Sequence, residues 1–206
     1  MNFNLWIESL TKPVPTFKKE KKNADLGEGV LHIAVAGLIT GFIIGLFQMF
    51  FGTTIASYYF PMASGFVGVT AFLASLILTP IMSVISWLIG SGILYIFALI
   101  FGGKGDYKTQ SYLYAIYSAP LGIISSILIL IPIAGPFLWL LTVLYGLYLL
   151  TMALKEAHNY TTGRAVLTWL APILIVVFLL LVIGIAVLAV IFGSMGNLGS
   201  MTLGRF

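Results

Sequence analysis

Long apolar runs separated by short polar segments dominate the chain. A helix needs about 20 apolar residues to cross the hydrocarbon core of a bilayer, which is roughly 30 Å thick. Five runs approach or exceed that length, at residues 30–51, 80–101, 111–131, 136–154 and 165–192. This pattern predicts an all-α polytopic membrane protein, built as a bundle of five transmembrane helices.

The second of these runs is preceded by further apolar sequence. As one helix, residues 65–101 would be about 54 Å long, far longer than a span of about 30 Å. Pro80 removes a backbone hydrogen bond near the middle, and the upstream piece, residues 66–79, is too short to span the membrane alone. We expect that piece to be re-entrant, interfacial or the first half of a strongly kinked helix. Pro120 and Pro172 are expected to kink the third and fifth helices.

An apolar stripe lies before the first run. Phe3, Trp6, Ile7 and Leu10 are spaced as i, i+3, i+4 and i+7, and the stripe ends before Pro13. This spacing predicts an N-terminal amphipathic helix that lies flat on the inner leaflet of the membrane.

The chain therefore divides into three parts. Residues 1–29 are expected to form a cytoplasmic interfacial arm with a lysine-rich run, and residues 30–192 the five-helix membrane domain. Residues 193–206 are expected to form a glycine-rich flexible tail on the outer side, because they follow the last apolar run.

The Asp, Glu, Lys and Arg residues occur in only four places: residues 8–28, 104–108, 155–164 and Arg205. Because a charge is costly in hydrocarbon, these places mark the segments that lie in water. Five spans put the two termini on opposite sides of the membrane. With the amino terminus in the cytoplasm, every Lys and Arg except Arg205 falls on the inner side, as the positive-inside rule requires. We therefore expect a cytoplasmic N-terminus and an outer C-terminus.

The composition restricts the kinds of functional site that the chain can hold. Hydrophobic residues make up 60% of the chain and charged residues 8%, against roughly 25% charged residues in soluble domains. There is no cysteine, so disulfides and thiolate sites are excluded. The absence of charge at membrane depth disfavours ion-coupled transport.

His32 and His158 could in principle meet as a metal site, beside Glu28 and Glu156. No helical HExxH pair is present, however, and lone interfacial histidines are common. We therefore expect no catalytic residue, no metal and no cofactor, and the protein is predicted not to be an enzyme.

Two sets of residues are candidates for contact. Gly37, Gly41 and Gly45 recur every four residues, which places them on one helix face as a packing seam. The seam is expected to receive a neighbouring helix of the same chain, with a homodimer as the alternative. The side chains expected to contact lipid or a partner are Trp6, Lys18, Lys19, Lys21, Lys22, Lys104, Lys108, Lys155 and Arg164.

Several segments resemble the Yip1 family of membrane proteins. They are residues 102–108 and 114–120, residues 131–135, 146–150, 154–158 and 163–165, and Trp6, Leu10, Pro13, Thr16 and Phe17 in the arm. The resemblance implies a five-helix membrane protein with a cytoplasmic amino terminus, which is the topology that the charges also indicate. Eukaryotic members are associated with vesicle trafficking and bind Rab-type small GTPases, partly through longer amino-terminal regions. This chain, with its short arm, is more similar to archaeal or bacterial members, which implies a prokaryotic cell membrane.

Two functions remain open at this point. The first is a non-enzymatic scaffold that organises or shapes the bilayer, or recruits a cytoplasmic partner, through the arm and residues 102–110 and 155–164. The alternative is a pore, or a transporter of lipid or a small solute through the bundle, with Gln48 as a candidate lining residue. The expected partners are membrane lipids and a cytoplasmic protein, and no nucleic acid is expected to bind.

Overall fold

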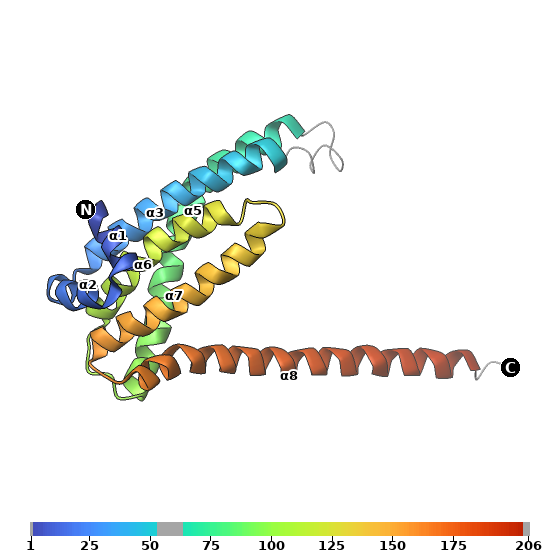
Figure 1. Cartoon of the computed structure of the whole chain (residues 1–206). Helices are drawn as coiled ribbons and strands as arrows, with labels where there is room; N and C mark the ends of the chain where they lie inside the picture. The colour runs from blue at the N-terminus through green and yellow to red at the C-terminus, as the bar shows by residue number, and fades with distance from the viewer. Residues whose placement is uncertain (1, 53–63, 204–206) are drawn as a thin grey trace.

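The computed structural model describes the backbone of residues 2–52 and 64–203 and the side chains of residues 2–51 and 68–191. Within these ranges the chain is helical, with short connections and no strand. The elements are α1 (Phe3–Thr11), α2 (Pro13–Glu20), the short 3-10 helix η1 (Lys21–Asn23), α3 (Leu26–Phe47), the π-helix η2 (Gln48–Gly52), α5 (Ser64–Ile100), α6 (Tyr107–Leu128), α7 (Ala134–His158) and α8 (Thr162–Leu203) (Figure 1).

Five helices in the described part of the chain are long and apolar enough to cross a membrane. They cover Leu26–Phe51, Gly68–Ile100, Tyr107–Leu128, Ala134–His158 and Thr162–Ile191. Each overlaps one of the five apolar runs, so the predicted all-α fold and the number of spans are confirmed.

Side-chain caps explain where several helices begin. Asn2 accepts a hydrogen bond from the backbone N–H of Asn4 (3.0 Å) at the start of α1, and Asp25 accepts one from Glu28 (2.9 Å) at the start of α3. Such caps satisfy backbone donors that have no partner within the helix. The polar residues between the apolar runs therefore fix the starts of these helices.

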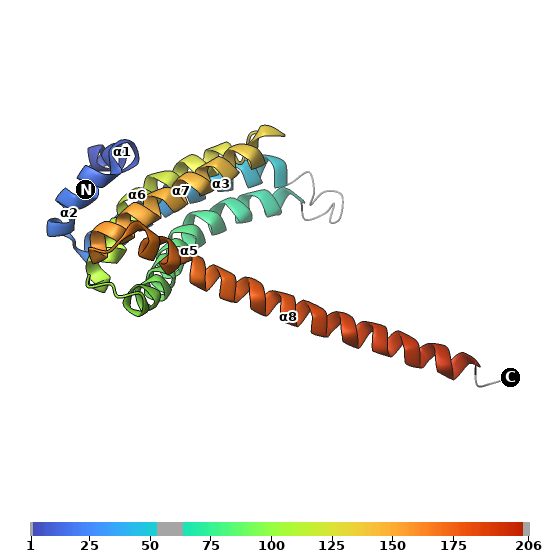
Figure 2. The ribbon, with the colours of Figure 1, turned by 60° about the horizontal axis from the view of Figure 1, so that its bottom comes forward.

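The stretch around Pro80 forms one helix. α5 runs without a break from Ser64 to Ile100 and contains Pro80, so a separate re-entrant piece over residues 66–79 is not seen. Its first half runs beside α3, and its second half turns away from that direction (Figures 1 and 2). Pro120 lies inside α6 and Pro172 inside α8, where the expected kinks remain predictions.

The last span, α8, is set apart from the other helices. Ala165 and Thr168 near its start are fully buried, whereas the side chains from Ile173 to Ile191 are exposed. The helix extends away from the bundle in both views (Figures 1 and 2). It continues as a helix to Leu203, so the tail predicted at residues 193–206 begins as part of α8, and its last three residues lie outside the described chain.

The amino-terminal arm packs onto the bundle. α1 contacts α6, and α2 contacts α7, at one end of the helices (Figure 2). Phe17 of α2 is fully buried in a core cluster with Leu113, Ile116 and Leu149. Of the predicted amphipathic stripe, Phe3 and Ile7 remain outward, with 57% and 63% of their surface exposed. The arm is thus a structural layer of the fold with an apolar outer face.

Candidate contact surface at the charged end

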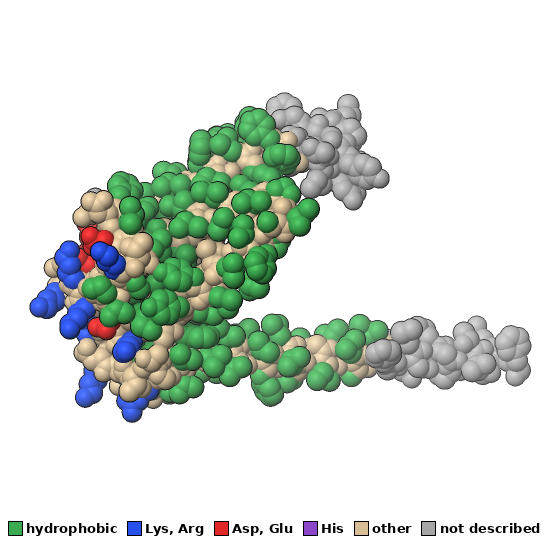
Figure 3. Space-filling model, in the orientation of Figure 1, with side chains coloured by type: hydrophobic (Ala, Val, Ile, Leu, Met, Phe, Trp, Pro, Cys, Tyr) green, Lys and Arg blue, Asp and Glu red, His purple; other side chains and the backbone are tan. Residues whose placement is uncertain are grey.

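The Lys, Arg, Asp and Glu side chains gather at one end of the molecule. This charged end is formed by residues 2–28, residues 101–108 and residues 155–164, and Figure 3 shows it on one side of a largely hydrophobic surface. The grouping follows from the sequence, because every polar connection on this side precedes or follows an apolar run.

Hydrogen bonds fix the arm at the charged end. The indole Nε1–H of Trp6 donates to Nδ1 of His32 in α3 at 2.7 Å, and the hydroxyl of Ser9 donates to the carbonyl of Ile116 in α6 at 3.0 Å. The hydroxyl of Tyr145 in α7 donates to the carbonyl of Leu10. Trp6 is only 7% exposed. It was expected to contact lipid or a partner, but here it packs α1 against α3, because its indole N–H finds a buried acceptor.

Lys21 also makes a contact within the fold. Its ammonium donates to the carbonyl of Glu156 at 2.7 Å and to Oδ1 of Asn159 at 2.9 Å. Asn159 ends α7 in a left-handed conformation, with φ of 53°. A lysine at this position satisfies a carbonyl that the helix leaves unpaired and complements the negative end of the helix dipole. Lys21 therefore links the arm to the end of α7.

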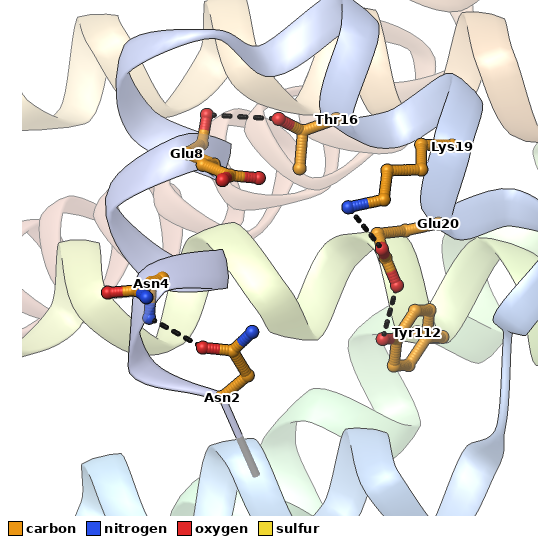
Figure 4. A network of polar contacts seen from close by, with 7 residues as sticks. All are labelled: Asn2, Asn4, Glu8, Thr16, Lys19, Glu20 and Tyr112. Carbon is orange, nitrogen blue, oxygen red and sulfur yellow. Dashed lines mark hydrogen bonds and ion pairs between the residues drawn. The ribbon is translucent and has the colours of Figure 1, made fainter.

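The other predicted basic contacts differ in their surroundings. Lys19 lies 3.9 Å from Glu20, whose carboxylate also accepts a hydrogen bond from the hydroxyl of Tyr112 at 3.2 Å (Figure 4). Lys155 and Arg164 line a hollow of about 590 Å³ beside residues 159–162. Four of the predicted contact lysines are exposed, and their side chains have no hydrogen bond or ion pair within the described part of the chain: Lys18, Lys22, Lys104 and Lys108. These four, together with Arg164, which is also exposed and has no ion pair in this part of the chain, are the predicted basic contacts available to an external partner.

A buried polar chain centred on His158 holds the connections of the charged end together. The backbone N–H of Gly105 donates to Nδ1 of His158 at 3.1 Å, so the proton of the neutral ring is on Nε2. That Nε2–H donates to Oε1 of Gln110 at 2.7 Å, and Nε2 of Gln110 donates to the carbonyl of Ser91 at 2.9 Å. His158 is fully buried and Gln110 is 2% exposed. The chain joins α5, α6, α7 and the connection before α6.

Two glycines allow this packing. A Cβ atom at Gly103 would lie 2.6 Å from Nδ1 of His158, and one at Gly105 would lie 2.2 Å from the carbonyl oxygen of Ala157. The glycines of this connection therefore admit the end of α7. His158 and His32 have separate hydrogen-bond partners and are not brought together. Sequence reasoning missed Gln110, whose signal is a polar side chain at the start of an apolar helix.

Asp106 caps α6 beside this cluster. Its carboxylate accepts a hydrogen bond from the backbone N–H of Thr109 at 2.6 Å, which lowers the pKa of the carboxyl from its ordinary value. We expect Asp106→Ala to lower the free energy of unfolding by about 1 kcal/mol at neutral pH. Because the folded state favours the carboxylate, this contribution is complete above about pH 4 and is lost as the pH falls through the folded pKa.

Denaturation in detergent micelles at several pH values measures this effect. Asp106→Asn is the matched control, since asparagine also caps helices but does not titrate. It should retain most of the stability at neutral pH. An equal loss in both variants at pH 7 would contradict the cap assignment.

A second hollow lies at membrane depth between α3, α5 and α6. It has a volume of about 280 Å³, and its polar lining consists of hydroxyl groups, from Thr40, Ser83, Ser86, Tyr114 and Ser118. The Ser118 hydroxyl is buried without a hydrogen-bond partner among the described residues.

The comparison with known proteins adds one finding. A family model described as the Yip1 domain matches residues 7–184, which is most of the chain. No curated protein and no solved structure matches.

Proposed function

Because the chain belongs to the Yip1 family, we propose that it is a non-enzymatic membrane protein that organises or shapes the bilayer and recruits a cytoplasmic partner at its charged end. The observation that carries the proposal is a set of four exposed lysines whose side chains have no partner in the described part of the chain: Lys18, Lys22, Lys104 and Lys108. Lys18 and Lys22 come from the arm, Lys104 from the connection before α6 and Lys108 from the first turn of α6, and these segments meet at one end of the bundle.

The charge pattern supports an orientation for this proposal. The positive-inside rule places a lysine-rich end in the cytoplasm. There, anionic headgroups attract each exposed lysine by about 1 kcal/mol. The docked arm holds Lys18 and Lys22 in fixed positions relative to the spans. A force on these lysines, such as their attraction to lipid headgroups, therefore also acts on the transmembrane helices.

The arrangement of the spans supports an effect on bilayer shape. α8 contacts α5 and α7 near the charged end and diverges from α3 toward the other end (Figure 1). A protein whose spans diverge takes up more area in one leaflet than in the other. That difference in area favours a curved bilayer around the protein.

A pore or transporter, the alternative from the sequence, is not favoured. The family match carries no indication of transport, and the hydroxyl-lined hollow is a single space of about 280 Å³. Transport requires a path that opens to both sides of the membrane.

Reconstitution into liposomes that contain anionic lipid tests the proposal. We expect vesicles that become smaller or tubular as the protein-to-lipid ratio rises, measured by electron cryomicroscopy, without release of an entrapped dye. Changing Lys18, Lys22, Lys104 and Lys108 together to glutamine should reduce the effect severalfold, because about 1 kcal/mol of lipid attraction is lost per charge.

Lys21→Gln is the control in this experiment. It removes the same kind of charge, but it breaks the internal contacts with Glu156 and Asn159, so it should lower thermal stability with less effect on vesicle shape. Dye release that rises with the number of protein copies would support the transporter instead. Round vesicles at every protein ratio would contradict the shaping role.

A further inference from the structure

A polar cavity lies under the arm at the charged end. It has a volume of about 390 Å³, between α1, α2 and the adjoining ends of α3 and α6. Six of its lining side chains carry the argument: Glu8, Lys19, Glu20, Glu28, His32 and Tyr112. The size is in the range of pockets that bind small molecules.

His32 supplies a donor without a partner in this cavity. Its side chain is 99% buried, since only 1% of the residue surface is exposed. Nδ1 accepts the hydrogen bond from the Trp6 indole, so the proton of the neutral ring is on Nε2. Nε2 has no hydrogen-bond partner among the described residues, and His32 lines the cavity. Nε2 is not among the fully buried unpaired atoms of the described chain, so it is accessible from the cavity, where its N–H is available to donate to a ligand.

The carboxylates in the cavity lining favour a ligand with a positively charged group. Glu8 comes from α1, Glu20 from α2 and Glu28 from α3, and Lys19 is the one basic side chain in the lining. Figure 4 shows Glu8 on one side of the space between α1 and α2, and Glu20 with Tyr112 on the other. Within the described residues no three carboxylates and histidines are close enough to hold a metal ion. A zwitterion whose ammonium needs only one or two of these carboxylates fits this spread better than a metal ion, which must bring several ligands together.

We infer that the cavity binds the zwitterionic group of phosphoethanolamine, with its primary ammonium between the carboxylates and its phosphate on the His32 Nε2–H and the Lys19 ammonium. This inference goes beyond the proposed function and does not rest on it. The trimethylammonium of phosphocholine would bind worse, because it has no N–H to donate. Quaternary ammonium groups are instead recognised by cages of aromatic rings, and Tyr112 is the one aromatic side chain in the lining.

The same chemistry occurs in a membrane lipid and in a free phosphoethanolamine compound. An apolar groove of about 330 Å³ lies along another face of α1, lined by Phe3, Ile7 and Leu10 of the arm and by Ile123 of α6. This groove could receive an acyl chain, which favours the lipid as the source. The experiment therefore tests the lipid and the free compound separately.

The test uses the full chain. Binding of O-phosphoethanolamine and of phosphocholine to the protein in micelles is measured by calorimetry, and retention of phosphatidylethanolamine against phosphatidylcholine is measured by native mass spectrometry. We expect saturable binding of the ethanolamine form, at least tenfold tighter than the choline form. Retention of the lipid without binding of the soluble probe would identify a lipid site that needs the groove, and the reverse would identify a free compound as the ligand.

Glu28→Gln and, separately, Glu8→Gln should each weaken binding at least tenfold. Both side chains are exposed at the cavity rim, and neither caps a helix, so the fold should be retained. Glu156→Gln, which makes the same change elsewhere at the charged end, is the control and should bind normally. Equal affinity for the two head groups, or unchanged binding in both rim variants, would overturn the inference. Neither result would bear on the vesicle-shape experiment, which depends on lysines outside this cavity.

Discussion

Replacing Gly41 with alanine should separate α3 from α5 and lower the free energy of unfolding by about 3 kcal/mol, at the upper end of the range for overpacked sites. A Cβ atom at Gly41 would lie 2.5 Å from the carbonyl oxygen of Ser75 and 3.1 Å from Cβ of Thr79. The first of these contacts is with backbone, which cannot rotate away. The hydroxyl of Ser75 also donates to the carbonyl of Gly41 at 3.0 Å, and this bond would be lost as the helices part.

The cost of the same substitution at the neighbouring glycines should depend on which atoms the added Cβ would meet. A Cβ at Gly37 would lie 2.6 Å from Cα of Pro80, again a backbone atom, so Gly37→Ala should cost about as much as Gly41→Ala. At Gly45 the nearest atom is the Ser75 hydroxyl, at 2.2 Å, which can move. Gly45→Ala should therefore cost less.

Thermal unfolding in detergent measures these differences. Gly90→Ala is the matched control, because it makes the same change in α5 at a position with no other atom within 4 Å of the added Cβ. It should leave the melting temperature unchanged or raise it slightly, since alanine is the better helix former. Equal melting temperatures for Gly41→Ala and Gly90→Ala would refute a close seam between α3 and α5.

We expect the second large effect from Gln110→Leu, which should lower the free energy of unfolding by about 2–4 kcal/mol. Leucine has nearly the same volume as glutamine but leaves the Nε2–H of His158 and the carbonyl of Ser91 without partners. Each buried unpaired group costs about 1–3 kcal/mol. Because the broken chain also includes the N–H of Gly105, residues 101–106 should become less protected as well.

Hydrogen–deuterium exchange, together with denaturation, tests this expectation. Exchange should become faster in residues 101–106 and at the end of α7, and remain slow in the middle of α3. Gln48→Leu is the control, since it makes the same change at an exposed position in η2. If both substitutions left stability and exchange unchanged, the His158 chain would have no structural role.

Much of the fold could be predicted from the sequence, because membrane spans are specified by local composition. Five apolar runs gave five spans, and the spacing of Gly37, Gly41 and Gly45 indicated a seam before any contact was known. The length of α5 was harder to predict. Proline removes one hydrogen bond from a helix, and the sequence does not say whether the helix ends there or continues beyond Pro80.

The contacts at the charged end could not be predicted, because they join distant segments. An amphipathic stripe has the same spacing whether it faces lipid or protein, so Trp6 gave no sign that its indole would meet His32. In the same way, nothing in the local sequence pairs Gln110 with His158. Lys21 was grouped with the other lysines by charge, although its position brings it to the end of α7.

The docking of the arm also sets an order of events during synthesis. Ser9 bonds to Ile116, 107 residues later, and Lys21 bonds to Glu156, 135 residues later. At roughly 5–20 residues per second, Ser9 leaves the ribosome about 5–20 s before its acceptor on α6 does. During that interval the lysines of the arm are free to interact with the translocation machinery and the membrane surface. The arm can therefore close on the bundle only once α6 and α7 have been made.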